Sequence, residues 1–193
     1  MIATESFSAL LTVVDAFDTL GIQYAVGGSV ASSIFGEPRS TADVDVLVAL
    51  FAHHVEPLIA RWNAGFYVDE SAVREALRTR SSFNVVHLET MDKIDVFVAG
   101  NDLLDREQMS RRRAVQLDSE PERTIYVTAP ENIVLRKLDW YRISGGVSDR
   151  QWRDVVGVIK MQGASLDRDY LDEIAVETGL TELLTRALGE AGP

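Results

Sequence analysis

The chain has 193 residues, of which 46% are hydrophobic and 25% charged, and its formal net charge is −11. These proportions are typical of a globular protein with enough apolar material for a core, and the acidic balance argues against a general affinity for nucleic acid. Cysteine is absent, which excludes disulfides, cysteine-ligated zinc and a cysteine nucleophile.

The first residues and the hydropathy of the chain bear on its location. No apolar run approaches the roughly 20 residues that cross a bilayer. The segment MIATESFSAL lacks the basic region and apolar run of a signal peptide. We therefore expect a cytoplasmic protein without a membrane partner.

The N-terminal two thirds predict alternating helices and short strands. Apolar residues at helical spacing predict a first helix over residues 5–20, which ends at Gly21. Further helices are expected at 29–36, 52–63 and 70–80, and strands at 23–27, 43–49, 83–89 and 93–99. The three residues 90–92 are short enough to join the last two strands as an antiparallel hairpin.

The character of the sequence changes at Pro130. Weaker strands are predicted at 114–117 and 124–128, and then only helices, at 131–144, 149–161, 168–178 and 181–189. This layout predicts an α+β fold, in which a mixed β-sheet flanked by helices is followed by a C-terminal helical part. We assign 1–129 to a catalytic core and 130–193 to a helical region packed on it.

Two aspartates interrupt an aliphatic run in GGSVASSIFGEPRSTADVDVLVAL, residues 27–50. In a strand, Asp43 and Asp45 share one face. Burying two like charges together is costly unless a cation neutralises them, and paired carboxylates suit Mg²⁺. A chance occurrence is the alternative, because a second Asp-x-Asp at 167–169 lies in polar surroundings and needs only a solvated helix start.

Asp95 repeats this pattern in the run Ile94–Val98. Asp92, three residues earlier, would face the other way. Three carboxylates on adjacent strands can hold two Mg²⁺ ions about 4 Å apart. One ion would then activate an attacking hydroxyl, and the other would hold a triphosphate.

A glycine turn precedes the aspartates. Gly28-Ser29 follows a predicted strand and opens a predicted helix, so the helix amides and the Ser29 hydroxyl can donate hydrogen bonds to a phosphate. A plain tight turn is the alternative. The Gly-Lys-Ser/Thr of a Walker A loop does not occur here.

Together these pieces resemble the signature of the nucleotidyltransferase (polymerase-β-like) superfamily, in which Gly-Gly/Ser is followed after about a dozen residues by Asp-x-Asp and later by a third strand aspartate. The GGS…RSTADVD form and the segments PENIVLRKLDWYR and SDRQWRDVVGVI resemble the abortive-infection (AbiEii-type) nucleotidyltransferase toxins and their uncharacterised relatives. The resemblance covers about residues 20–185. It departs from the pattern at Gln151, where many relatives have an acidic residue.

The resemblance implies roles for particular residues. It makes Asp43, Asp45 and Asp95 the catalytic metal ligands, and the following residues the nucleotide site: Gly27, Gly28, Ser29, Arg39, Thr41 and Lys137.

Three further residues have two interpretations each. Lys137 lies in an apolar helical stripe and either reaches solvent or points into the cleft. Arg39 belongs either to a surface turn or to the cleft. Asp154 is an accessory candidate that would orient Lys137 or the acceptor, or a surface carboxylate.

The other candidates are weaker. The three histidines lack metal-ligand spacing and are interpreted as structural. The tryptophans are interpreted as core or interface residues, with base stacking as the alternative for one of them. The basic run 111–113, with Arg106 nearby, is either a solvated surface or a phosphate contact.

The sequence therefore predicts a nucleotidyltransferase that uses two Mg²⁺ ions, or Mn²⁺, to move an NMP group from an NTP to an acceptor hydroxyl with release of pyrophosphate. The toxin-like resemblance implies a tRNA, other RNA or protein acceptor, and an antitoxin partner. One alternative is transfer to an aminoglycoside-like antibiotic, a cationic small molecule that an acidic protein would attract. The other is a non-catalytic nucleotide-binding or toxin–antitoxin interaction module.

Overall fold

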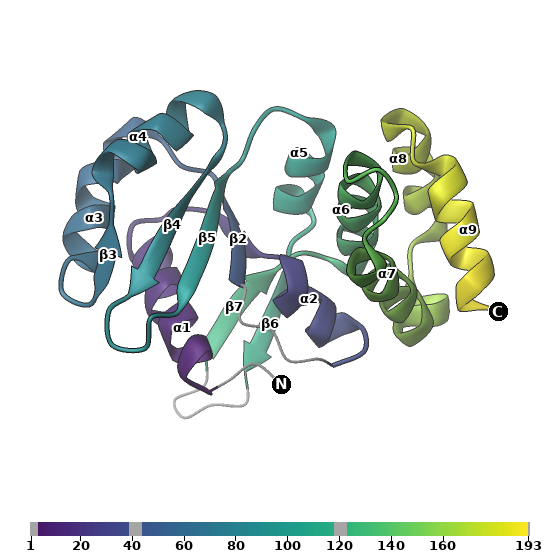
Figure 1. Ribbon diagram of the computed structural model, residues 1–193, viewed down its shortest axis with the longest axis horizontal. Coiled ribbons are helices and arrows are strands. Elements are labelled where there is room, and N and C mark those ends of the chain that lie inside the picture. The colour runs from purple at the N-terminus through teal and green to yellow at the C-terminus, as the bar shows by residue number, and fades with distance from the viewer. Residues whose placement is uncertain (1–3, 39–43, 118–122, 193) are drawn as a thin grey trace.

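The computed structural model describes residues 4–38, 44–117 and 123–192. Its centre is one seven-stranded mixed sheet with the order β3-β4-β5-β2-β1-β7-β6, and helices flank the sheet and continue beyond it to the C-terminus (Figure 1). The predicted fold class is confirmed.

The seven strands run in both directions. β1 is antiparallel to β2 and parallel to β7, whereas β2 is parallel to β5. β4 pairs antiparallel with β3 and β5, and β6 pairs antiparallel with β7. Their bounds are β1 Tyr24–Val26, β2 Val44–Val48, β3 Phe66–Val68, β4 Ser82–His87, β5 Lys93–Val98, β6 Arg113–Leu117 and β7 Arg123–Val127.

The helices follow the predicted order. Their bounds are α1 Thr4–Thr19, α2 Gly28–Phe35, α3 Val55–Trp62, α4 Glu70–Thr79, α5 Leu103–Ser110, α6 Pro130–Ile143, α7 Asp149–Gln162, α8 Arg168–Thr178 and α9 Thr181–Ala191, with short 3₁₀ turns at Ala52–His54 and Gly163–Ser165. The elements α5 and β3 were not predicted. β3 is too short for a periodic signal, and α5 has few apolar residues, although Asp102 caps its N-terminus by accepting from the Asp105 amide.

Side chains along the central strands alternate between the two faces of the sheet, and each face has its own apolar cluster. The side chains of Val44, Val46 and Val48 belong to the main core, which also contains residues of α1, α3, α4 and α6. On the opposite face, Ala25 and Leu47 pack against Met109 of α5 in a small second cluster. This second face leaves room for polar residues beside α5, because its apolar cluster is small.

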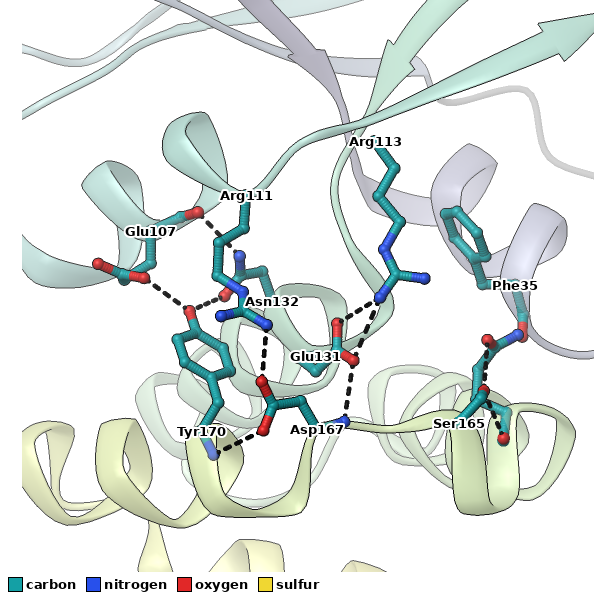
Figure 2. A network of polar contacts seen from close by, with 10 residues as sticks. Phe35, Glu107, Arg111, Arg113, Glu131, Asn132, Ser165, Asp167 and Tyr170 are labelled. Carbon is teal, nitrogen blue, oxygen red and sulfur yellow. Dashed lines mark hydrogen bonds and ion pairs between the residues drawn. The ribbon is translucent and has the colours of Figure 1, made fainter.

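Polar contacts join the C-terminal helices to the sheet region (Figure 2). Glu131, at the start of α6, is fully buried. It accepts hydrogen bonds from Nη2 of Arg113 at 3.3 and 3.4 Å and from the amide of Asp167 at 3.1 Å. Arg111 donates to Asp167 at 3.0 Å and lies 3.8 Å from the ring centroid of Tyr170. Arg112 donates to the carbonyl oxygen of Met109 and lies 4.9 Å from the ring centroid of Tyr126, so all three arginines of the basic run 111–113 have structural partners. In the part of the chain that the structure describes, no helix is long and apolar enough to cross a membrane.

Candidate active site

The two described strand aspartates, Asp45 and Asp95, are direct neighbours. β2 and β5 are parallel, and the register sets Asp45 opposite Asp95, so both side chains leave the same face of the sheet. Both are partly exposed, whereas the residues on either side of each are buried. Lys93 Nζ lies 3.0 Å from Asp95 Oδ2. The predicted juxtaposition of these two carboxylates is thus present in the fold.

The glycine turn lies directly against Asp45. The amide of Gly27 donates to the carbonyl oxygen of Asp45 at 2.8 Å, which holds the end of β1 beside β2. Gly28 opens α2 with φ +53°, and a Cβ built on it would lie 1.7 Å from Oδ2 of Asp45. Any side chain at position 28 would therefore displace the Asp45 carboxylate, and the N-terminus of α2 comes directly against it.

A cavity of about 670 Å³ opens over this arrangement. Its size is within the usual range of small-molecule sites, roughly 300–1,000 Å³. Among its lining residues are six that the sequence singled out: Gly27, Gly28, Ser29, Asp45, Asp95 and Lys137. The fold brings these residues together from the turn after β1 and from α2, β2, β5 and α6.

Three predicted site residues, Arg39, Thr41 and Asp43, lie outside the described residues, and their roles stay predictions. Within the described ranges, no group of three or more histidines, cysteines or carboxylates is placed to hold a metal ion. The available donor set is therefore the Asp45–Asp95 pair. Its carboxylate oxygens are the ligands that Mg²⁺ prefers, and two adjacent like charges are stabilised by a cation between them. These residues fit a divalent cation.

Lys137 does not reach solvent. Only 6% of it is exposed, and its Nζ lies 2.8 Å from Oδ2 of Asp154 and 2.9 Å from Oε1 of Gln151, both on α7. The structure supports the interpretation of Asp154 as the group that orients Lys137. Because Lys137 also lines the cavity, this buried ion pair holds a cationic side chain at the wall of the site.

The other charged residues of the cavity were not singled out from the sequence. Arg136 of α6 bonds to Asp102 and Asp105 of α5, and all three line the cavity together with Arg80 and Arg150. Burial raises the pKa of the Asp105 carboxyl. Asp102 and Asp105 were missed because the sequence did not predict α5, the helix at whose N-terminus they lie. On α6, however, the spacing of 133, 136, 137 and 140 marks one helical face, and all four of these residues line the cavity.

Two of the three tryptophans are core residues, and the third lines the cavity. Trp62 and Trp152 are buried, as expected for core residues, but Trp140 is 46% exposed and lines the cavity. His87 contacts Thr90 at 2.9 Å within the hairpin, and the rings of His53 and His54 lie 4.0 Å apart beside Phe51. The histidines thus lie outside the cavity lining.

No protein-family model matches the sequence, and no curated protein matches it. Solved structures do. An antigenic nucleotidyltransferase-like protein from Paracoccidioides brasiliensis is 17% identical, with a TM-score of 0.56 over 97% of this chain and 94% of that one. The chain has the nucleotidyltransferase fold. ANT(2'')-Ia in complex with adenylyl-2''-tobramycin is 12% identical, with a TM-score of 0.58 over 91% and 99% of the two chains. The lincosamide antibiotic adenylyltransferase LnuA, with lincomycin bound, is 11% identical, with a TM-score of 0.51 over 81% and 96%.

These similarities cover nearly the whole of each solved chain, so the nucleotidyltransferase fold extends through the C-terminal helices as well as the sheet. At such low identity they concern the fold alone. The closer resemblance to AbiEii-type toxins rests on sequence motifs and stays a prediction.

Proposed function

We propose that the protein is a Mg²⁺-dependent nucleotidyltransferase that moves an NMP group from an NTP to an acceptor hydroxyl. One observation carries this proposal. Asp45 and Asp95 lie side by side in register, and Asp45 lies directly against a helix N-terminus that only glycine can open. Helix N-termini bind phosphate, and a carboxylate pair beside one suits a phosphate-bound cation.

The residues of the chain would divide the work as follows. Gly27, Gly28 and Ser29 would bind the triphosphate at the start of α2. Asp45 and Asp95, with Asp43 as the predicted third ligand, would hold two Mg²⁺ ions. When bound, these ions neutralise the triphosphate and activate the acceptor hydroxyl. Lys137, fixed by Asp154, would meet the phosphates from α6.

The proposed reaction needs only the NTP and the acceptor hydroxyl as reactants. The acceptor oxygen attacks the α-phosphorus, the bond between the α-phosphorus and the bridging oxygen breaks, and pyrophosphate leaves. The hydroxyl proton passes to the Asp95 carboxylate. The protein contributes mainly positioning and charge stabilisation.

Two lines of support favour different acceptors. The sequence motifs favour RNA, tRNA above all, or a protein hydroxyl, in a toxin paired with an antitoxin. The solved structures of similar fold that carry tobramycin and lincomycin compounds favour a small-molecule acceptor. A non-catalytic nucleotide-binding module is the third candidate, and the retained Asp45–Asp95 pair argues against it.

The test is nucleotide transfer from each of the four α-labelled NTPs in turn, with Mg²⁺ and, as acceptor, total RNA, cell lysate protein or a panel of aminoglycosides and lincosamides. We expect label on one acceptor class with wild type, and a loss of roughly 10²–10³-fold in Asp45→Asn, because one stabilising charge is removed from the site. Equal labelling by wild type and Asp45→Asn would contradict the proposal. Nucleotide binding without any transfer would instead favour the binding module.

A further inference from the structure

Thr128 lies beside the glycine turn, and no motif pointed to it. It directly follows β7, and its amide donates to the carbonyl oxygen of Val26 at 2.9 Å. This bond continues the parallel pairing of β7 with β1 and sets Thr128 next to Gly27. A Cβ built on Gly27 would lie 3.6 Å from Oγ1 of Thr128. Thr128 also lines the cavity.

The Thr128 hydroxyl is buried without a hydrogen-bond partner. The residue is 1% exposed, and its Oγ1 is one of three buried side-chain atoms without a partner in the described part of the chain. The other two, on Trp62 and Arg112, belong to residues that do not line the cavity. A buried hydroxyl with no partner destabilises a protein, and a valine would occupy the same space without that cost.

The hydroxyls nearest in sequence to the turn contrast with Thr128. Ser32 donates to the carbonyl oxygen of Gly28 at 2.8 Å, and Ser33 donates to that of Ser29 at 2.9 Å. These serines bond back to their own helix, as hydroxyl side chains in helices commonly do. The Thr128 hydroxyl, in contrast, has no such partner among the described residues and belongs to a residue that lines the cavity beside the turn.

We propose that Thr128 binds the nucleotide, by donating a hydrogen bond to a phosphate oxygen of the triphosphate held at the turn Gly27–Ser29. This inference rests on the proposed function for the presence of a nucleotide. It adds a binding residue that directly follows β7, on the side of the turn opposite β2. The phosphate oxygen is the hydrogen-bond acceptor that the hydroxyl lacks in the free protein. The hydroxyl therefore destabilises the free protein and stabilises the complex.

The proposal predicts that one variant is more stable without ligand but binds the nucleotide more weakly. Thr128→Val should raise the thermal midpoint of the ligand-free protein by roughly 2–4 °C, because the unsatisfied hydroxyl is gone. The same variant should weaken binding of the Mg²⁺ complex of an NTP about tenfold, because a hydrogen bond to a charged oxygen is lost. Thr128→Ser keeps the hydroxyl and should bind within about threefold of wild type.

Calorimetric titration with each NTP and with inorganic triphosphate, all with Mg²⁺, separates the phosphate from the rest of the nucleotide. We expect Thr128→Val to lose affinity for both kinds of ligand by the same factor. The matched control is Thr124→Val, an exposed threonine on the same strand, which should change neither binding nor the thermal midpoint.

Two binding results would overturn the role of Thr128 but leave the proposed function standing. One is wild-type affinity in Thr128→Val, and the other is a loss of NTP affinity in this variant without any loss of triphosphate affinity. A lower midpoint in the ligand-free Thr128→Val would also contradict it, because the hydroxyl would then have a partner inside the protein. If wild type itself binds neither NTP nor triphosphate, the proposed function fails together with this inference.

Discussion

Two polar clusters of the molecule differ in how their groups are satisfied. In the cluster around Glu131, which Figure 2 shows, each carboxylate has a donor from the protein: Glu131 has Arg113 and the Asp167 amide, and Asp167 has Arg111. In the cavity over the sheet, Asp45 and Asp95 stand side by side in register with Lys93 Nζ 3.0 Å from Asp95, and the Thr128 hydroxyl has no partner among the described residues.

The difference distinguishes a structural cluster from a ligand site. Polar groups that are fully satisfied within the protein rigidify it and join its elements. Groups left in like-charged pairs or without partners cost stability, and they are explained when a ligand completes them. By this criterion the cluster of Glu131 joins the sheet region to α6 and α8, whereas the adjacent carboxylates and the Thr128 hydroxyl favour the proposal that the cavity binds an external cation and phosphate.

The largest expected effect on nucleotide binding is at Gly28. The added Cβ of Gly28→Ala would collide with the Asp45 carboxylate, so we expect the affinity for the Mg²⁺ complex of an NTP to fall by about 10²-fold, the scale of two lost charge-assisted hydrogen bonds. Gly21→Ala is the matched control, because Gly21 also has a positive φ, +66°, but nothing lies within 4 Å of its Cβ position. It should be destabilised by about 1 kcal/mol and bind normally. Equal binding by the two variants would show that the turn does not hold the nucleotide.

A smaller effect is expected at Trp140, whose exposed ring lines the cavity one helical turn beyond Lys137. If the ring stacks on the nucleobase, Trp140→Ala weakens NTP binding about tenfold, the scale of one base–aromatic stack, but leaves the affinity for inorganic triphosphate unchanged. Trp140→Phe should retain most of the binding. The same loss for triphosphate as for NTP would contradict stacking on the base.

The smallest effect on binding is expected in the satisfied cluster. Glu131→Ala leaves Arg113 and the Asp167 amide without their acceptor, and we expect it to lower the free energy of unfolding by about 2 kcal/mol. Its NTP affinity, measured well below the thermal midpoint, should equal that of wild type. A loss of affinity in the folded variant would show that the two clusters are coupled, and the comparison between them would fail.

Much of this arrangement could be predicted from the sequence, because its strongest signals are local. Alternating valines and aspartates placed Asp45 on one face of a strand, and the glycine pair marked a turn into a helix. The strand register that sets Asp45 opposite Asp95 depends on long-range pairing, and it was only an expectation until the fold was known.

Other parts could not be predicted from local patterns. α5, with Asp102 and Asp105, has too few apolar residues for a periodic signal. The sequence offered Asp154 as a group that would orient Lys137, but it could not choose between this and a surface carboxylate, because the contact depends on how α7 crosses α6. Thr128 is ordinary at the end of a strand. Only its position beside Gly27, with a buried hydroxyl that lacks a partner, distinguishes it.

The most direct test of the central claim is to compare the thermal stability of wild type and Asp45→Asn with and without Mg²⁺ and an NTP. The quantity compared is the stability that each protein gains from the ligands. With both ligands at about 100 times their dissociation constants, wild type should gain about 2.7 kcal/mol, while the variant gains little. If Asp45→Asn gains as much from Mg²⁺ and NTP as wild type does, the carboxylate pair is not the site of a nucleotide-bound cation.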